Sequence, residues 1–164
     1  MANTLTIDRA RNWQLGTDET VSPTDTVAAD FNGDGWTDIA TVTPEDPSAR
    51  VFVLLNQDGD GFAAPVTTAA IANAADLTAG DVNGDGNMDL LVAGGSTAFV
   101  NGPSEIGVLL GNGQGGFTAG ADLAVGGNPL DTAFVDLNGD GHGDLVVAHE
   151  STAPWACAWA TVRA

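Results

Sequence analysis

A nine-residue pattern rich in oxygen-bearing side chains occurs three times in this chain of 164 residues. The pattern reads D-x-N-G-D-G-x-x-D and begins at Asp30, Asp81 and Asp136. Carboxylate and amide oxygens at alternate positions, with glycines where the chain turns sharply, are ligands that suit Ca²⁺. The same residues offer little to a transition metal, which prefers nitrogen or sulfur donors. The repeated pattern therefore predicts three metal sites of one kind.

Each position of the pattern has an expected role, which the first copy illustrates. The side chains of Asp30, Asn32 and Asp34, at positions one, three and five, are expected to converge on one centre. Position six is a glycine that permits the turn. Trp36 at position seven would offer its backbone carbonyl, and Asp38 at position nine would complete the set. We expect about three Ca²⁺ ions per chain. The predicted ligands are Asp30, Asn32, Asp34, Trp36, Asp38, Asp81, Asn83, Asp85, Asn87, Asp89, Asp136, Asn138, Asp140, His142 and Asp144.

Two other readings of the pattern are less consistent with the sequence. An EF-hand needs a bidentate glutamate at position twelve and flanking helices, but this chain has Thr41, Val92 and Val147 there. These three residues belong to short apolar runs that are typical of buried strands. A simple hairpin turn with solvated aspartates would explain one copy. It would not explain the same ligand spacing in three copies, so we favour metal binding.

The sequence around the loops indicates the size of the repeating unit. The loops start 51 and 55 residues apart, and residues 51–62 resemble residues 106–117 in a strand, a glycine-rich turn and a phenylalanine at the same offset. Short runs before and after each loop bring the count to four expected strands per unit. A four-stranded unit of about 50 residues is typical of a β-propeller blade.

These residues resemble the FG-GAP or VCBS repeats, which build the N-terminal propeller of integrin alpha subunits and occur in many bacterial surface proteins and lectins. The resemblance rests on DFNGDGxxDIA, DVNGDGxMDLLVA and DLNGDGxGDLVVA, on VLLNQDGDGF and VLLGNGQGGF, and on the segment FAAP at 62–65, and it covers about residues 23–150. It implies a Ca²⁺-binding loop between the first two strands of each blade. Asn32, Asn83 and Asn138 stand where this family often has aspartate, so each site should bind somewhat more weakly.

The expected fold is all-β and consists of about three propeller blades, the third incomplete. We assign residues 23–73 to blade 1, 74–128 to blade 2 and 129–164 to an incomplete blade 3. Residues 1–22 would form an N-terminal strand, a candidate donor that completes another blade. After Ala148 the expected glycine-rich segment is missing, although Trp155–Val162 alternates enough to form a third strand. A frameshift after Pro154 is one hypothesis for this tail.

Propellers close with roughly four to eight blades. We therefore expect this partial propeller to be completed by a homo-oligomer or by the remainder of a longer propeller.

The composition limits the partners and the location of the protein. The net charge is −18, from 22 acidic residues and four arginines. Such a surface should repel nucleic acids and anionic membranes. No apolar run approaches the roughly 18 residues of a membrane span, and residues 1–4 do not begin a signal peptide. Because weak calcium sites fill only where calcium is millimolar, we expect an extracellular or cell-surface protein. The single Cys157 does not decide the compartment.

Two functions are consistent with these features. The first is a non-enzymatic, calcium-stabilised module for adhesion that binds a protein or a carbohydrate, as the family resemblance implies. The second is a structural protein that assembles into an oligomer or filament through blade or strand complementation. An enzyme ranks third, since the chain has no Ser/His/Asp signature and no zinc motif. We assign no catalytic residues and no residues that contact the ligand.

Overall fold

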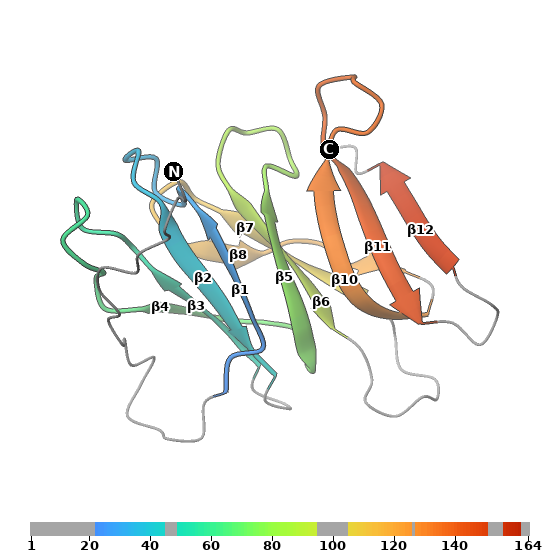
Figure 1. Ribbon diagram of the computed structural model, residues 1–164, viewed down its shortest axis with the longest axis horizontal. Helices are drawn as coiled ribbons and strands as arrows, with labels where there is room; N and C mark the ends of the chain where they lie inside the picture. Colours follow the sequence, from blue (N-terminus) through green and yellow to red (C-terminus); the bar gives the residue numbers. More distant parts are fainter. Residues whose placement is uncertain (1–21, 45–48, 95–104, 126, 151–155, 162–164) are drawn as a thin grey trace, which may run out of the picture.

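The computed structural model describes residues 22–44, 49–94, 105–125, 127–150 and 156–161. Within these ranges the chain forms β-strands and no helix, and the strands make three antiparallel sheets (Figure 1). This confirms the all-β prediction. The predicted N-terminal strand, including Trp13–Val21, lies outside the described residues.

Each sheet is an up-and-down meander in which consecutive strands pair. Sheet 1 contains β1 (Asp25–Ala29), β2 (Asp38–Thr43), β3 (Arg50–Leu54) and β4 (Val66–Ala69), in that order. Sheet 2 contains β5 (Ala74–Gly80), β6 (Asp89–Gly94), β7 (Glu105–Gly111) and β8 (Phe117–Ala119), with the short β9 (Leu123–Ala124) also paired to β7. Sheet 3 contains β10 (Asn128–Val135), β11 (Asp144–Glu150) and β12 (Ala156–Thr161).

Corresponding residues of sheets 1 and 2 pair in the same register. Ile39 of β2 lies opposite Leu54 of β3, and Leu90 of β6 lies opposite Leu109 of β7. This agreement follows from the similar sequences of the two units, because a slip of one residue would turn each apolar side chain to the other face.

The apolar core lies between the sheets. Val42 and Val51 of sheet 1 pack with Leu90 and Val92 of sheet 2 in one cluster of buried side chains. Because successive side chains of a strand point to opposite faces, the alternate residue Leu91 belongs to a second cluster, with Leu145 and Val147 of sheet 3. Sheet 2 is thus covered on both faces, which is why all six residues of β6 are buried.

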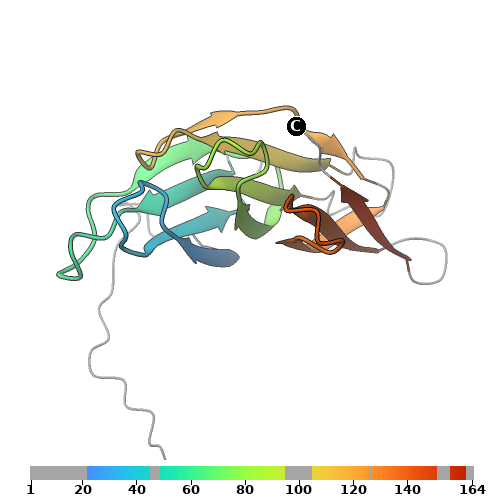
Figure 2. The ribbon, with the colours of Figure 1, turned by 90° about the horizontal axis from the view of Figure 1, so that it is seen from above.

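The first strands of the three sheets, β1, β5 and β10, lie side by side, and the sheets follow one another when seen from above (Figures 1 and 2). Asp25 Oδ2 accepts a hydrogen bond of 2.9 Å from the backbone amide of Leu77 in the next sheet. Asp76 Oδ2 accepts bonds from the amide (2.8 Å) and the hydroxyl (2.6 Å) of Thr132 in the sheet after that. The same contact therefore joins both pairs of neighbouring sheets.

The C-terminal tail supplies a third strand to sheet 3, as the sequence predicts. Strand β12 pairs antiparallel with β11, with Val146 opposite Trp159 and Asp144 opposite Thr161. The ends of the predicted strand, Trp155 and Val162, lie outside the described residues.

Candidate metal centres

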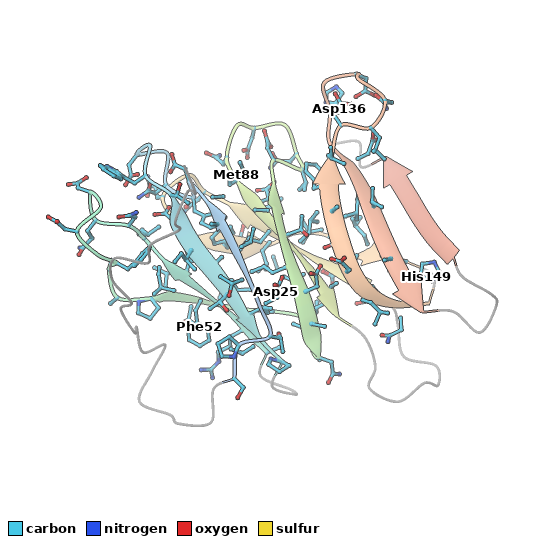
Figure 3. All side chains as sticks on the ribbon, in the orientation of Figure 1. Asp25, Phe52, Met88, Asp136 and His149 are labelled. Atoms are coloured by element: carbon cyan, nitrogen blue, oxygen red, sulfur yellow. The ribbon has the colours of Figure 1, made fainter. Side chains whose placement is uncertain are left out.

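The three acidic loops occupy equivalent places in the fold. Each one connects the first and second strands of its sheet, so the loops are residues 30–37, 81–88 and 136–143. They lie along one edge of the molecule, at the top of Figure 1, and Asp136 is labelled in the third loop in Figure 3. The predicted position of each loop between two strands is therefore correct.

The aspartate at position one holds its loop in shape. In the first loop Asp30 Oδ1 accepts the amide of Gly33 at 2.7 Å, and Oδ2 accepts the amide of Gly35 at 2.8 Å. Both glycines have positive φ, 74° and 88°, a conformation that costs a residue with a Cβ more than it costs glycine. Asp81 and Asp136 make the same two bonds at 2.7 to 2.9 Å.

Positions three and five are joined to each other. Asn32 Oδ1 accepts the amide of Asp34 at 3.0 Å, and Asn32 Nδ2 donates to Asp34 Oδ2 at 2.8 Å. Asp34 Oδ1 in turn accepts the amide of Trp36 at 2.8 Å. The second and third loops repeat all three bonds. Position seven donates its backbone amide in every loop, a contact that Trp36, Asn87 and His142 all make.

The aspartate at position nine has a different environment from the other loop acids. Asp38 is fully buried, and its two oxygens accept amides from both sides: Phe31 at 2.9 Å and Asn56 at 2.7 Å. Asp89 does the same with Val82 at 2.9 Å and Gly111 at 2.8 Å. This residue therefore ties the loop to the end of the third strand. The sequence pattern did not predict this role, although an aspartate that directly precedes an apolar strand was its visible sign.

The third loop lacks one of these contacts. Asp144 Oδ2 accepts the amide of Leu137 at 3.1 Å, but its buried Oδ1 has no hydrogen-bond partner among the described residues. In the register of β11 and β12, the residue that corresponds to Asn56 and Gly111 is 162, which lies outside the described residues.

The donor chemistry of the loops fits a hard cation, although the expected ligands are only partly brought together. Positions one, three and five share each loop, whereas position nine is turned toward the interior. Among the described residues no group of three or more acidic, histidine or cysteine side chains is arranged to hold a metal ion. Each carboxylate has about four lone-pair sites, so the amides that it accepts leave capacity for a cation. The ligand set stays a prediction.

Local hydrogen bonds and burial act on the loop carboxylates in opposite directions. The amide of Gly35 is the main cause that lowers the pKa of Asp30, and the amide of Asn87 is the main cause that lowers the pKa of Asp85. Burial raises the pKa of Asp89, and the amides of Gly111 and Val82 oppose this shift. The lowered pKa values of Asp30 and Asp85 therefore favour the charged forms of these two carboxylates.

Comparison with known families supports the resemblance noted in the sequence. Residues 30–92 match the family model of the FG-GAP-like repeat. This stretch runs from the first acidic loop through β6 and includes the second acidic loop, so the FG-GAP resemblance is confirmed there. A search of curated proteins found no match to the chain. In the described part of the chain no helix is both long enough and apolar enough to cross a membrane.

Proposed function

We propose that the three sheets are blades of a calcium-stabilised β-propeller that works outside the cell as a non-enzymatic binding module. The FG-GAP-like repeat and the packing of three consecutive antiparallel sheets against one another support this assignment. The strongly acidic composition disfavours a nucleic acid partner. A protein or carbohydrate ligand of the kind used in adhesion fits this class of module best.

The observation that carries the proposal is a set of five hydrogen bonds, made by positions one, three and five, that all three acidic loops share. In each loop the residues at positions one, three and five would hold the ion, together with the carbonyl of position seven. When bound, the cation would offset the repulsion among carboxylates that each loop gathers. Position nine would contribute mainly by fixing the loop on the sheet, since both of its oxygens already accept amides in blades 1 and 2.

The proposed role of calcium predicts a large effect of the ion on stability. At a free concentration 100-fold above the dissociation constant, each independent site adds about 2.7 kcal/mol to the free energy of unfolding. We expect calorimetric titration to detect calcium binding and EDTA to lower the melting temperature, whereas magnesium at the same concentration should act less. Asp85→Ala should remove one site without abolishing the other two. Absence of binding heat together with an unchanged melt at millimolar calcium would contradict the proposal.

The binding function has its own test. The calcium-loaded protein should retain a specific glycan or protein on an array or in a pull-down, and EDTA should weaken this retention because the blades loosen. Retention that is equal with and without EDTA would separate ligand binding from calcium.

A further inference from the structure

The residue at position two of each acidic loop packs against the next sheet. Phe31 is only 1% exposed, its ring centroid lies 5.7 Å from that of Phe117 in sheet 2, and its carbonyl accepts the amide of Gly115 at 3.0 Å. Val82 is 8% exposed and belongs to the core cluster that includes Leu145 of sheet 3. An apolar residue at position two therefore marks the contact with the following sheet.

The residue at position two of the third loop, Leu137, is also apolar, but it is not buried against another sheet. Leu137 is 57% exposed, and Leu130 and Val135 on the preceding strand are 54% and 47% exposed. These are the three most exposed large apolar side chains in the described ranges. Leu130 and Val135 lie on β10, and Leu137 lies on the loop that follows it. Exposed apolar residues that lie close together are typical of an interaction site. We call Leu130, Asp131, Val135 and Leu137 the trailing face.

The aspartate contact between sheets also ends at the trailing face. Asp25 and Asp76 each accept the amide of a residue in the next sheet. Asp131 occupies the same position in sheet 3, five residues before the acidic loop. It is exposed, and within the described part of the chain its carboxylate accepts no hydrogen bond. Sheet 3 therefore presents both parts of the contact, the apolar residue and the acceptor.

The other end of the molecule presents the matching donor. Thr132, which donates its amide and hydroxyl to Asp76, directly follows Asp131. The residue in the same place on β1 is Thr26, directly after Asp25, and it is exposed, as is Ala28 on the same strand. The hydroxyl of Thr26 donates to Thr41 Oγ1 at 3.1 Å within sheet 1. The backbone amide of Thr26 is therefore the donor that corresponds to the amide that Thr132 gives to Asp76.

We call the exposed side of β1 that carries Thr26 and Ala28 the leading side. We propose that the leading side of a second copy of this chain binds to the trailing face of the first copy. Asp131 of one copy accepts the backbone amide of Thr26 of the other, and Leu137 is covered in the way that Phe31 and Val82 are covered within the chain. The choice of a second copy rests on continuity with the two interfaces that the chain already contains. The inference rests on the proposed blade character of the sheets but does not require bound calcium. Because different surfaces meet, the association is head to tail and leads to a ring or a filament.

The test is the particle mass by sedimentation equilibrium over a concentration series, in calcium and in EDTA. The buffer needs about 0.15 M salt, at which surface charges are screened beyond about 8 Å. We expect the wild-type mass to exceed that of one chain and to rise with concentration. Asp131→Ala should weaken association by about tenfold to a hundredfold, because a hydrogen bond to a charged group is lost. A wild-type protein that stays monomeric at every concentration overturns the proposal.

Two further variants test the head-to-tail geometry. Leu137→Asp should disable the trailing face, and Thr26→Asp should disable the leading side by facing Asp131 with a like charge. Each variant alone should be monomeric, but an equimolar mixture retains one intact interface and should form dimers and nothing larger. Val66→Asp, on the outer strand β4, is the matched control and should assemble like the wild type. A mixture that stays monomeric, or single variants that assemble normally, would refute this geometry.

The calcium and assembly results separate the two proposals. Assembly without calcium binding would reject the calcium site and keep the docking surface, and calcium binding by a monomer would do the reverse. Unchanged circular dichroism of each variant shows that a loss of assembly is not a loss of folding. If Leu137→Asp fails to fold, Val135→Asp, which places a charge on the same trailing face, takes its place in the mixture.

Discussion

At the scale of single residues, the nine loop aspartates divide into two groups by environment. Those at positions one and five lie in the loops, where they accept backbone amides of the same loop. Those at position nine are buried, and in sheets 1 and 2 each bridges two backbone segments that lie far apart in the sequence. The first group therefore shapes the exposed loops, and the second group is part of the folded framework.

This division predicts different costs for one substitution at two equivalent sites. Asp89→Asn should destabilise the protein by about 1–3 kcal/mol, because an amide nitrogen would face one of two backbone donors and leave it unpaired. Asp144→Asn should cost less, since in the part of the chain that the structure describes Oδ1 of Asp144 has no partner to lose. Urea unfolding in EDTA measures both without a contribution from calcium. Equal losses for the two variants would contradict the bridging role of Asp89.

At the scale of elements, each loop and its neighbouring turn are shaped by glycines for two different reasons. Gly84 needs its positive φ of 77°, and an added Cβ would meet no atom within 4 Å. Gly111, at the end of β7, donates its amide to Asp89, and an added Cβ would overlap the carbonyl oxygen of Met88. The loop glycine is therefore required by conformation and the strand glycine by space.

The two causes predict an order of stability losses. Gly84→Ala should cost about 1–2 kcal/mol, the penalty of a left-handed conformation for a residue with a Cβ. Gly111→Ala should cost more, because the overlapping atom belongs to the backbone and relief of the overlap would disturb the bond to Asp89. Chemical unfolding of both variants in EDTA tests this order. A Gly111→Ala protein as stable as Gly84→Ala would show that the turn adapts.

At the scale of the whole molecule, the sheets are held together by apolar packing and by the aspartate contacts between first strands. Figure 3 shows Asp25 between β1 and β5, where it accepts the amide of Leu77. Burial raises the pKa of Asp76, and repulsion from Asp25 and Asp131 adds to the shift, while the bonds from Thr132 oppose it. The three aspartates therefore lie close enough along the stack to influence one another.

The raised pKa of Asp76 predicts part of the pH dependence of stability. A raised pKa means that the folded state favours protonated Asp76, which stabilises the fold at low pH. This stabilisation is complete below the ordinary pKa of 3.8 and is lost as the pH rises through the raised pKa of the folded state. Asp76→Asn should lack this loss, so its stability relative to the wild type should increase as the pH rises from 3.8 upward. The lowered pKa values of Asp30 and Asp85 act in the opposite direction but cancel in the difference. A difference that does not vary with pH would contradict the assignment.

The sequence by itself determined the features that depend on neighbouring residues. The glycines and aspartates of D-x-N-G-D-G shape each loop through contacts no more than five residues apart, and the apolar runs after them form β2, β6 and β11. The repeat of about 50 residues likewise indicated the three similar sheets. These patterns are local, so they can be read without knowledge of the fold.

Only the tertiary structure decided which residues of the repeats have partners. Asp38 and Asp89 receive amides 18 and 22 residues away, and Asp76 receives those of Thr132, 56 residues away. The similar positions of Val82 and Leu137 in the motif gave no sign that one is buried and the other exposed. That difference arises because sheet 2 has a neighbour on its far side within the described chain and sheet 3 does not, and packing between sheets is set by position in the stack.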